Sequence, residues 1–333
     1  MKKNNFIHPM LLSAFSLLAT GLHAQPTKIK ALIIDGQNNH KWKETTPVLR
    51  QILENSGVFT VDISTSPPEI AKAPALPKDA TPEQKSAHAA ALTAFHAEDA
   101  KRAALAAPLW RKWQPRFSDY GVVISNYNGE NWPKEQYDAL ISYVKNGGGF
   151  VSYHAADNAF GDQADYNEMI GLGGWGGRNA KSGPYLRLTD GTWKQEESPG
   201  PCGGHGAQQE FIVETFAPGH PIMKGLPPRW MHAKDELYHS LRGPAKNLSV
   251  LGHALSDQTH KQEPILMAIS YGKGRVFHTT LGHYLEALDG LGFQITLCRG
   301  AEWAATGNVT QPAPAPGTLT EGPTAALRPI TIK

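Results

Sequence analysis

Short apolar segments alternate with segments of helical periodicity through the first half of this 333-residue chain. The strand-like runs are residues 30–35, 58–63, 120–125 and 150–153. Amphipathic helices are predicted over residues 45–55 and from Pro133 to the glycines at 147–149. Because strands that alternate with helices usually pair side by side, this order predicts an α/β fold with a doubly wound, mostly parallel sheet.

The C-terminal half carries further strand-like segments before a last helix. Residues 265–271 and 275–280 flank the tight turn Gly272-Lys273-Gly274, which predicts an antiparallel hairpin near the C-terminus. A helix is predicted from about residue 290 to residue 305. The remaining strand-like segments are residues 211–215 and 249–254.

The first 24 residues have the features of a cleavable export signal. Lys2 and Lys3 precede an apolar run over residues 10–22, and Leu22-His23-Ala24 is a small-residue cleavage pattern. This run is shorter than the roughly 20 residues that span a bilayer, so we expect a periplasmic or secreted protein without membrane contact after cleavage. Cleavage lowers the 32 Lys and Arg to 30, equal to the 30 Asp and Glu. A neutral chain has no general basic surface for nucleic acid.

The rest of the chain is expected to form a single domain over residues 25–306. A proline-rich linker and an Ala-rich helix interrupt the strand order and predict a helical insertion over residues 66–118. Thr81 to Gln84 has the pattern of a capping box that begins this helix, and the helix is expected to end near Ala107. Residues 307–333 are rich in Pro, Ala, Gly and Thr, so we expect a flexible tail that does not join the core.

Several common site motifs are absent from the sequence. The loop after the first strand has one glycine, whereas a dinucleotide fingerprint needs three. There is no Gly-x-Ser-x-Gly elbow and no short-range cluster of Cys and His for structural zinc. Cys202 and Cys298 lie far apart, and the sequence leaves a disulfide between them open. No neighbour of Cys202 in the sequence favours a thiolate, so a nucleophilic role is not expected.

His154 directly follows the predicted strand 150–153. Ligands bind at the carboxyl ends of strands in open α/β sheets, so His154 is placed for acid–base chemistry or metal binding. His40 follows the first strand, and His283 follows the last one. His278, inside that last strand, is as readily a packing residue. We expect His154 and His283 to be catalytic. The cofactor stays open, with a divalent metal held by His40, His154 and His283 as the candidate.

Two polar segments offer further candidate residues. Gln37, Asn38 and Asn39 carry donors and acceptors that suit a hydroxylated ligand, although Asn also simply favours turns. Asp235 and Glu236 point to opposite sides if their segment is extended, so that one enters a cleft while the other forms a pair. The sequence does not choose between them, and both are candidate catalytic residues.

With these residues the chain resembles the trehalose-utilisation (ThuA-like) family. The matching motifs are Gly36 to His40, Gly147 to Asp157, His220-Pro221-Ile222, Asp235 to Tyr238, Tyr271 to Phe277 and Leu281-Gly282-His283. They cover roughly residues 28–305. The resemblance implies a flavodoxin-like sheet similar to class I glutamine amidotransferases, in which a cysteine stands on a sharp turn after a strand. His154 occupies the comparable place here, so hydrolysis of glutamine is not expected.

The resemblance implies a role in sugar metabolism, especially on glycosides oxidised to keto-sugars. A ketone acidifies the neighbouring C–H group, and a base, an acid or a metal could then support isomerisation, epimerisation, or eliminative or hydrolytic cleavage. Asp157 and Tyr238 belong to the shared motifs and are expected to contact a small-molecule carbohydrate. Aromatic residues that suit stacking on a sugar are Trp175, Tyr185, Trp193 and Trp230. The alternative is a non-catalytic carbohydrate-binding protein on an amidotransferase-like scaffold. The oligomeric state is left open.

Overall fold

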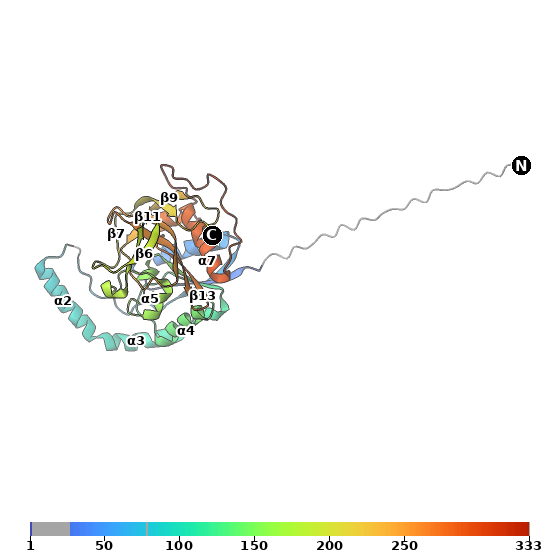
Figure 1. The fold of residues 1–333 in the computed structure, drawn as a ribbon. Coiled ribbons are helices and arrows are strands. Elements are labelled where there is room, and N and C mark those ends of the chain that lie inside the picture. Colours follow the sequence, from blue (N-terminus) through green and yellow to red (C-terminus); the bar gives the residue numbers. More distant parts are fainter. Residues whose placement is uncertain (2–26, 78, 333) are drawn as a thin grey trace.

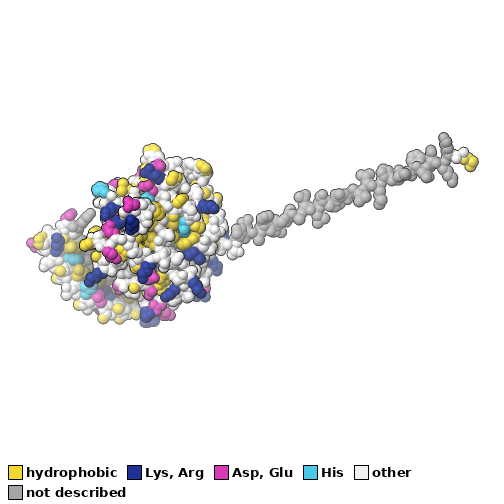
Figure 2. All heavy atoms as spheres, viewed as in Figure 1, with side chains coloured by type: hydrophobic (Ala, Val, Ile, Leu, Met, Phe, Trp, Pro, Cys, Tyr) yellow, Lys and Arg dark blue, Asp and Glu magenta, His cyan; other side chains and the backbone are white. Residues whose placement is uncertain are grey.

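The computed structural model describes Met1, residues 27–77 and residues 79–332. The predicted export signal at residues 1–24 lies outside the described residues apart from Met1. Among the described residues, no helix combines the length and the apolar character that crossing a bilayer requires. On the face drawn in Figure 2, basic and acidic side chains are interspersed rather than gathered by sign.

A nine-stranded sheet forms the centre of the molecule, in the order β2-β1-β3-β4-β13-β12-β11-β8-β9. Its strands are β1 (Ile29–Asp35), β2 (Phe59–Thr65), β3 (Val122–Ser125), β4 (Gly149–Tyr153), β8 (Gln209–Thr215), β9 (Arg229–Asp235), β11 (Leu248–Leu255), β12 (Gln262–Tyr271) and β13 (Gly274–Thr279). The strands from β2 to β13 in this order are parallel, and those from β13 to β9 are antiparallel. The α/β class is therefore as predicted, and the antiparallel part extends well beyond the expected hairpin of β12 and β13.

Helices cover both faces of this sheet. They are α1 (Trp42–Asn55), α2 (Pro82–Ala97), α3 (Asp99–Lys112), α4 (Lys134–Lys145), α5 (Ala164–Ile170), α6 (Leu285–Leu288) and α7 (Leu291–Thr306). In β1, Ala31 and Ile33 belong to the core beneath α1 and α7, whereas Leu32 and Ile34 belong to the core beneath α3, α4 and α5. This burial on both faces explains why the strand reads as a continuous apolar run in the sequence.

Two small sheets lie outside the central one. β5 (Tyr185–Thr189) pairs with β6 (Thr192–Glu196), and β7 (Gly204–His205) pairs with β10 (Tyr238–His239). The second pair matters for the site described below, because it places His205 directly beside Tyr238. Short 3₁₀ turns are η1 (Phe117–Asp119), η2 (His154–Asn158) and η3 (Ala180–Ser182).

The predicted insertion is helical but contains two helices rather than one. The capping box forms, with Thr81 Oγ1 accepting from Gln84 N and Gln84 Oε1 accepting from Thr81 N. α2 then ends at Ala97, and α3 continues to Lys112 instead of stopping near Ala107. α2 has no buried residue and lies at the outer edge of the molecule, whereas α3 leads back to the body (Figure 1). Trp110 anchors α3, because its side chain is buried in the core that α3, α4 and α5 cover.

The C-terminal segment does join the core, contrary to the prediction of a free tail over residues 307–333. Leu319 is buried in the core that α1 and α7 cover. Thr320 accepts a hydrogen bond from the Met231 backbone N–H, and Leu327 forms a bridge with Gly290. Composition alone missed this packing, because the buried Leu319 and the strand-like backbone contacts are isolated within a polar, proline-rich stretch.

Gly149 allows α7 to approach β4 closely, which gives a first testable prediction. A Cβ at this position would lie 2.6 Å from the backbone of Ala304. We expect Gly149→Ala to lower the free energy of unfolding by about 1–3 kcal/mol, because the helix must move to admit a methyl group. Gly219→Ala is the matched control, since nothing lies within 4 Å of the added Cβ. Equal urea midpoints for the two variants would contradict this account of the contact.

Candidate functional site

A cleft of about 860 Å³ lies where several strands of the parallel part end. The loop after β1 contributes residues 36–40, the loop after β3 contributes Asn128, η2 after β4 contributes Asn158, and the loop after β13 contributes His283. Glu236, Tyr238, His205 and Trp175 also line it. Its position agrees with the general location of ligand sites in open α/β sheets, and its volume falls within the usual range for small ligands.

Four side chains in this region converge on one point. The nearest ligand atoms of His40, His154, Glu236 and His283 all lie within 4.8 Å of one another. The ring centroid of His40 is 4.9 Å from those of both His154 and His283. The structure therefore brings together the three histidines that the sequence placed after separate strands, and it adds a carboxylate.

His154 is held by its first ring nitrogen and presents the second. It is the first residue after β4, with a φ of 45°, and its side chain is buried. Nδ1 lies 2.7 Å from the Thr280 carbonyl oxygen, which can only accept, so Nδ1 carries the hydrogen. Nε2 is then unprotonated and accepts a hydrogen bond from the Tyr238 hydroxyl at 2.9 Å. In this tautomer Nε2 can bind a metal once the Tyr238 hydroxyl gives up its hydrogen bond to it.

His40 is positioned by Asn38. The Asn38 Oδ1 atom accepts from the His40 backbone N–H at 2.8 Å and lies 3.1 Å from His40 Nδ1. The Asn38 amide in turn donates to Asn126, at the end of β3. Burial, followed by the nearby His154 and His283, lowers the pKa of His40 to about 3. His40 is therefore a neutral imidazole over the physiological pH range, which is the form that binds metals.

Glu236 is the carboxylate that faces the cleft. Its Oε1 atom lies 3.3 Å from His283 Nε2 and 3.6 Å from His205 Nδ1. The Gln208 amide lies 3.0 Å from His283 Nδ1, so both ring nitrogens of His283 have polar neighbours. Burial and the nearby His154 lower the pKa of His283, as they do for His40.

Asp235 points away from the cleft and holds its neighbours in place. Its carboxylate accepts from His232 Nε2 at 2.8 Å and from the backbone N–H groups of Glu236, Gly282 and His283 at 2.7–2.9 Å. Burial would raise the pKa of Asp235, but the hydrogen bond and charge of His232 lower it overall. Of the two adjacent acids that the sequence left undecided, Glu236 therefore reaches the cleft, and Asp235 fixes the positions of Glu236 and His283.

The amide-rich loop after β1 serves mainly to hold the cleft together. Gln37 lines the cleft, but its Nε2 donates to the Pro67 carbonyl at 2.8 Å and its Oε1 accepts from the Glu130 backbone at 2.8 Å. Asn38 positions His40, as described above. Asn39 is exposed. Its backbone N–H donates to the Asn128 side-chain oxygen, and its own side-chain oxygen accepts from the Asn128 amide. Of the three predicted substrate-binding residues, Asn39 is therefore the one whose side chain lies at the open side of the cleft.

Asp157 does not reach the cleft, contrary to the prediction that it contacts a substrate. It is fully buried in η2, and its Oδ2 atom lies 3.7 Å from Nε2 of the equally buried His278. His278 donates its Nδ1–H to the Ile170 carbonyl at 3.0 Å, so it is a packing residue. The short helical turn after β4 directs Asp157 inward, and the strand pattern of the sequence did not indicate that turn.

Trp175 and His205 complete the lining of the cleft. Trp175 is one of the aromatic residues that the sequence offered for stacking, and its ring centroid is 4.7 Å from that of Tyr238. The other aromatic residues considered for stacking do not line it: Tyr185 and Trp230 are buried, and Trp193 packs against Phe216 and His253. His205 reaches the cleft only because the two-residue strand β7 pairs with β10, a contact too short to leave a sequence signal.

Neither cysteine takes part in this site. Cys202 and Cys298 are both free thiols in the structure. Burial raises the pKa of Cys202, and it raises the pKa of Cys298 to about 12. Both thiols are therefore protonated at neutral pH, which agrees with the expectation that Cys202 is not a nucleophile.

Comparisons with known proteins place the chain among ThuA-like proteins. A family model described as "ThuA: Trehalose utilisation" matches residues 83–304. The crystal structure of a ThuA-like protein from Parabacteroides merdae is 40% identical, with a TM-score of 0.76, and the match covers 91% of this chain and 98% of that one. A ThuA-like protein from Bacteroides uniformis is 19% identical over 85% of this chain and 95% of that one, with a TM-score of 0.48. No protein of curated function matches the sequence significantly.

Proposed function

Because the chain belongs to the ThuA family, we propose that it is an enzyme of sugar metabolism that acts on a glycoside or keto-sugar with the help of a divalent metal. One observation carries this proposal: three imidazoles and one carboxylate, from four separate loops, lie within 4.8 Å of one another in a cleft of ligand size. Burying several polar side chains together without a partner is unfavourable, so a bound metal ion would account for this arrangement.

The donor set suits a catalytic transition metal. Imidazole nitrogens favour zinc and its neighbours, and a carboxylate oxygen is a common further ligand. Ligand atoms at about 2.0–2.2 Å from one ion lie at most about 4.4 Å apart. The observed limit of 4.8 Å therefore needs only small side-chain rotations. Asp235 and Asn38 hold His283 and His40 in place through hydrogen bonds, as residues around a metal site commonly do for its ligands.

Two residues beside the ligand set are placed to move protons. A bound metal would polarise the oxygen of a ketone or alcohol. His205 Nδ1 lies 2.9 Å from the Gly206 carbonyl and so carries the hydrogen, which leaves Nε2 as a base at the edge of the cleft. The Tyr238 hydroxyl donates to His154 Nε2 in this structure, and a metal bound at that nitrogen would free the hydroxyl to donate to a sugar oxygen. We propose that His205 removes the proton beside the ketone and that Tyr238 donates at the oxygen.

The scaffold of the amidotransferases also fits the described backbone. The parallel strands β2-β1-β3-β4-β13 follow the order 2-1-3-4-5 of flavodoxin-like sheets. His154 has a positive φ and stands directly after β4. This is the place that corresponds to the cysteine on the sharp turn of the amidotransferases. We infer that a thiol nucleophile has been replaced by a metal ligand on this scaffold. Export to the periplasm or beyond remains a prediction from residues 1–24, to be tested by N-terminal sequencing of the mature protein.

The proposed chemistry is tested by proton exchange. Methyl glucosides oxidised at C2, C3 or C4 are incubated with metal-loaded protein in D₂O, and NMR follows the C–H groups beside the ketone. We expect exchange with at least one of these sugars, together with a product or released methanol. Binding of the sugars without exchange, change or release would instead support the carbohydrate-binding alternative and sink the enzymatic proposal.

Tyr238→Phe should separate catalysis from metal binding. Loss of the hydroxyl removes the proposed proton donor but none of the four ligand side chains. We expect kcat to fall about 100-fold, with metal affinity retained or raised, because the hydroxyl no longer competes for His154 Nε2. Tyr271→Phe is the matched control, because its hydroxyl is bonded to Asp165 away from the cleft. A Tyr238→Phe variant with unchanged kcat would exclude the tyrosine from proton transfer.

A further inference from the structure

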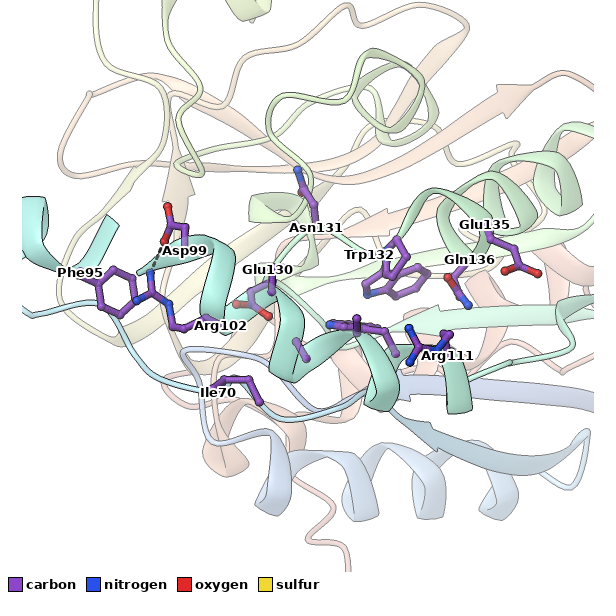
Figure 3. A pocket seen from close by; sticks show the side chains of 15 residues that line it. Ile70, Phe95, Asp99, Arg102, Arg111, Glu130, Asn131, Trp132, Glu135 and Gln136 are labelled. Atoms are coloured by element: carbon purple, nitrogen blue, oxygen red, sulfur yellow. Dashed lines mark hydrogen bonds and ion pairs between the residues drawn. The ribbon is translucent and has the colours of Figure 1, made fainter. Parts of the chain in front are cut away.

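A second cavity, of about 550 Å³, lies between the helical insertion and the body of the protein (Figure 3). One wall is α3, with Ala103, Ala106 and Trp110. The other is formed by Trp132, in the segment that leads into α4, and by Gln136, in the first turn of α4. The floor is largely apolar, so the cavity differs in character from the polar cleft that contains the histidines.

One buried polar atom in the wall of this cavity has no hydrogen-bond partner among the described residues. Gln136 is 4% exposed, and its Oε1 atom accepts no hydrogen bond, although Nε2 donates to the Trp113 carbonyl. The indole N–H of Trp132, in the same wall, lies next to the phenol of Tyr127. Buried polar groups are nearly always paired, so the unpaired oxygen of Gln136 in the wall of a cavity points to a missing ligand.

The remaining walls define the shape and charge of that ligand. Trp110 and Trp132 give the cavity flat aromatic sides, and each of them meets Trp113, which does not line the cavity, edge to face. Arg111 lines the rim and has no acidic partner among the described side chains, whereas Arg102 is paired with Asp99. A flat ring with a phenolic hydroxyl matches these features, because its O–H can donate to Gln136 and its oxygen can accept from a cation such as the Arg111 guanidinium.

We propose that this cavity binds a planar phenolic group, and that the group is the aglycone of the glycoside whose sugar lies in the cleft. The two cavities are neighbours, because the same two segments line both. Pro68 and Glu69 line the cleft, and Ile70 lines the second cavity. Gly129 lines the cleft, and Glu130 lines the second cavity. Binding of the phenolic group stands on the cavity alone, whereas its identity as an aglycone rests on the proposed function.

The first measurement is equilibrium dialysis of the full chain with 4-nitrophenol and with nitrobenzene. We expect 4-nitrophenol to bind more tightly, because only its hydroxyl can donate to Gln136. In Ala103→Trp an indole fills the cavity from its exposed side, and we expect the affinity to fall at least about tenfold. Ala104→Trp is the matched control: its neighbouring side chain is exposed, does not line the cavity, and should leave binding within about twofold of wild type.

The second measurement compares 4-hydroxyphenyl with methyl glucopyranosides, as α and β anomers. One oxygen of the 4-hydroxyphenyl aglycone joins the sugar, and the other keeps the hydrogen that can be donated to Gln136. We expect a 4-hydroxyphenyl glucoside to bind at least about tenfold more tightly than its methyl counterpart, and Ala103→Trp to remove that gain. If 4-nitrophenol binds but no glucoside gains from the aryl group, the cavity takes a free phenol and the aglycone assignment fails, whatever the catalytic function. If 4-nitrophenol does not bind, or Ala103→Trp binds it as wild type does, the ligand site itself is refuted.

Discussion

His154→Ala is expected to lower the affinity for a divalent metal at least about 100-fold and to abolish turnover. The variant removes one of the four ligand side chains. The orientation of this side chain is fixed by the hydrogen bond from His154 Nδ1 to the Thr280 carbonyl. Isothermal titration of chelator-treated protein with Zn²⁺ and with Mn²⁺ measures the loss. The fold should survive, because His154 belongs to neither apolar core and its ring packs against those of His40 and Tyr238 in the polar region of the site.

His96→Ala provides the matched control for this variant. His96 is an exposed histidine on α2, far along the insertion from the four converging side chains. We expect its metal affinity and turnover to equal those of the wild type. Metal affinity that falls equally in both variants would show that the ion binds histidines nonspecifically on the surface.

Asp235→Ala is expected to destabilise the protein by about 3–5 kcal/mol, the largest effect on stability among the substitutions proposed. The change leaves the N–H groups of Glu236, Gly282 and His283 buried without their acceptor, and it leaves His232 without its partner. Since the pKa of Asp235 is lowered from 3.8 by folding, this stabilisation is full above that value and is lost as the pH falls below it.

The stability of Asp235→Ala is measured as a urea midpoint at neutral pH. Asp138→Ala is the control, because Asp138 forms an exposed pair with Lys134 that contributes little. We expect the control to stay within about 0.5 kcal/mol of the wild type. If Asp235→Ala matched the control, Asp235 could not be the residue that fixes the loop of His283.

The parallel half of the fold could be predicted from the sequence because its signals are local. The apolar run of β1 reflects burial on both faces of the sheet, and the glycines at 147–149 mark where α4 ends and β4 begins. The antiparallel edge of the sheet was harder to predict from the sequence. β9 was not identified as a strand, because Arg229–Asp235 mixes charged and aromatic residues and forms a strand only by pairing with β8.

The candidate site was predicted in part for the same reason. His40, His154 and His283 each follow a strand, and parallel strands bring their carboxyl ends to one edge, so their convergence follows from the topology. The choice between Asp235 and Glu236 depends on hydrogen bonds to Gly282 and His283, more than 45 residues away. His205 depends on a strand pair of two residues. Contacts of these kinds leave no periodic pattern in a single sequence.

X-ray absorption spectroscopy of the metal-loaded protein tests the central claim most directly. Chelator-treated protein is dialysed against Zn²⁺ and freed of excess metal before the spectrum is recorded. The account predicts about one ion per chain, bound by three imidazole nitrogens and a carboxylate oxygen at about 2.0–2.2 Å. A chain that retains no ion, or an ion whose shell contains sulfur or fewer than two imidazoles, would contradict it.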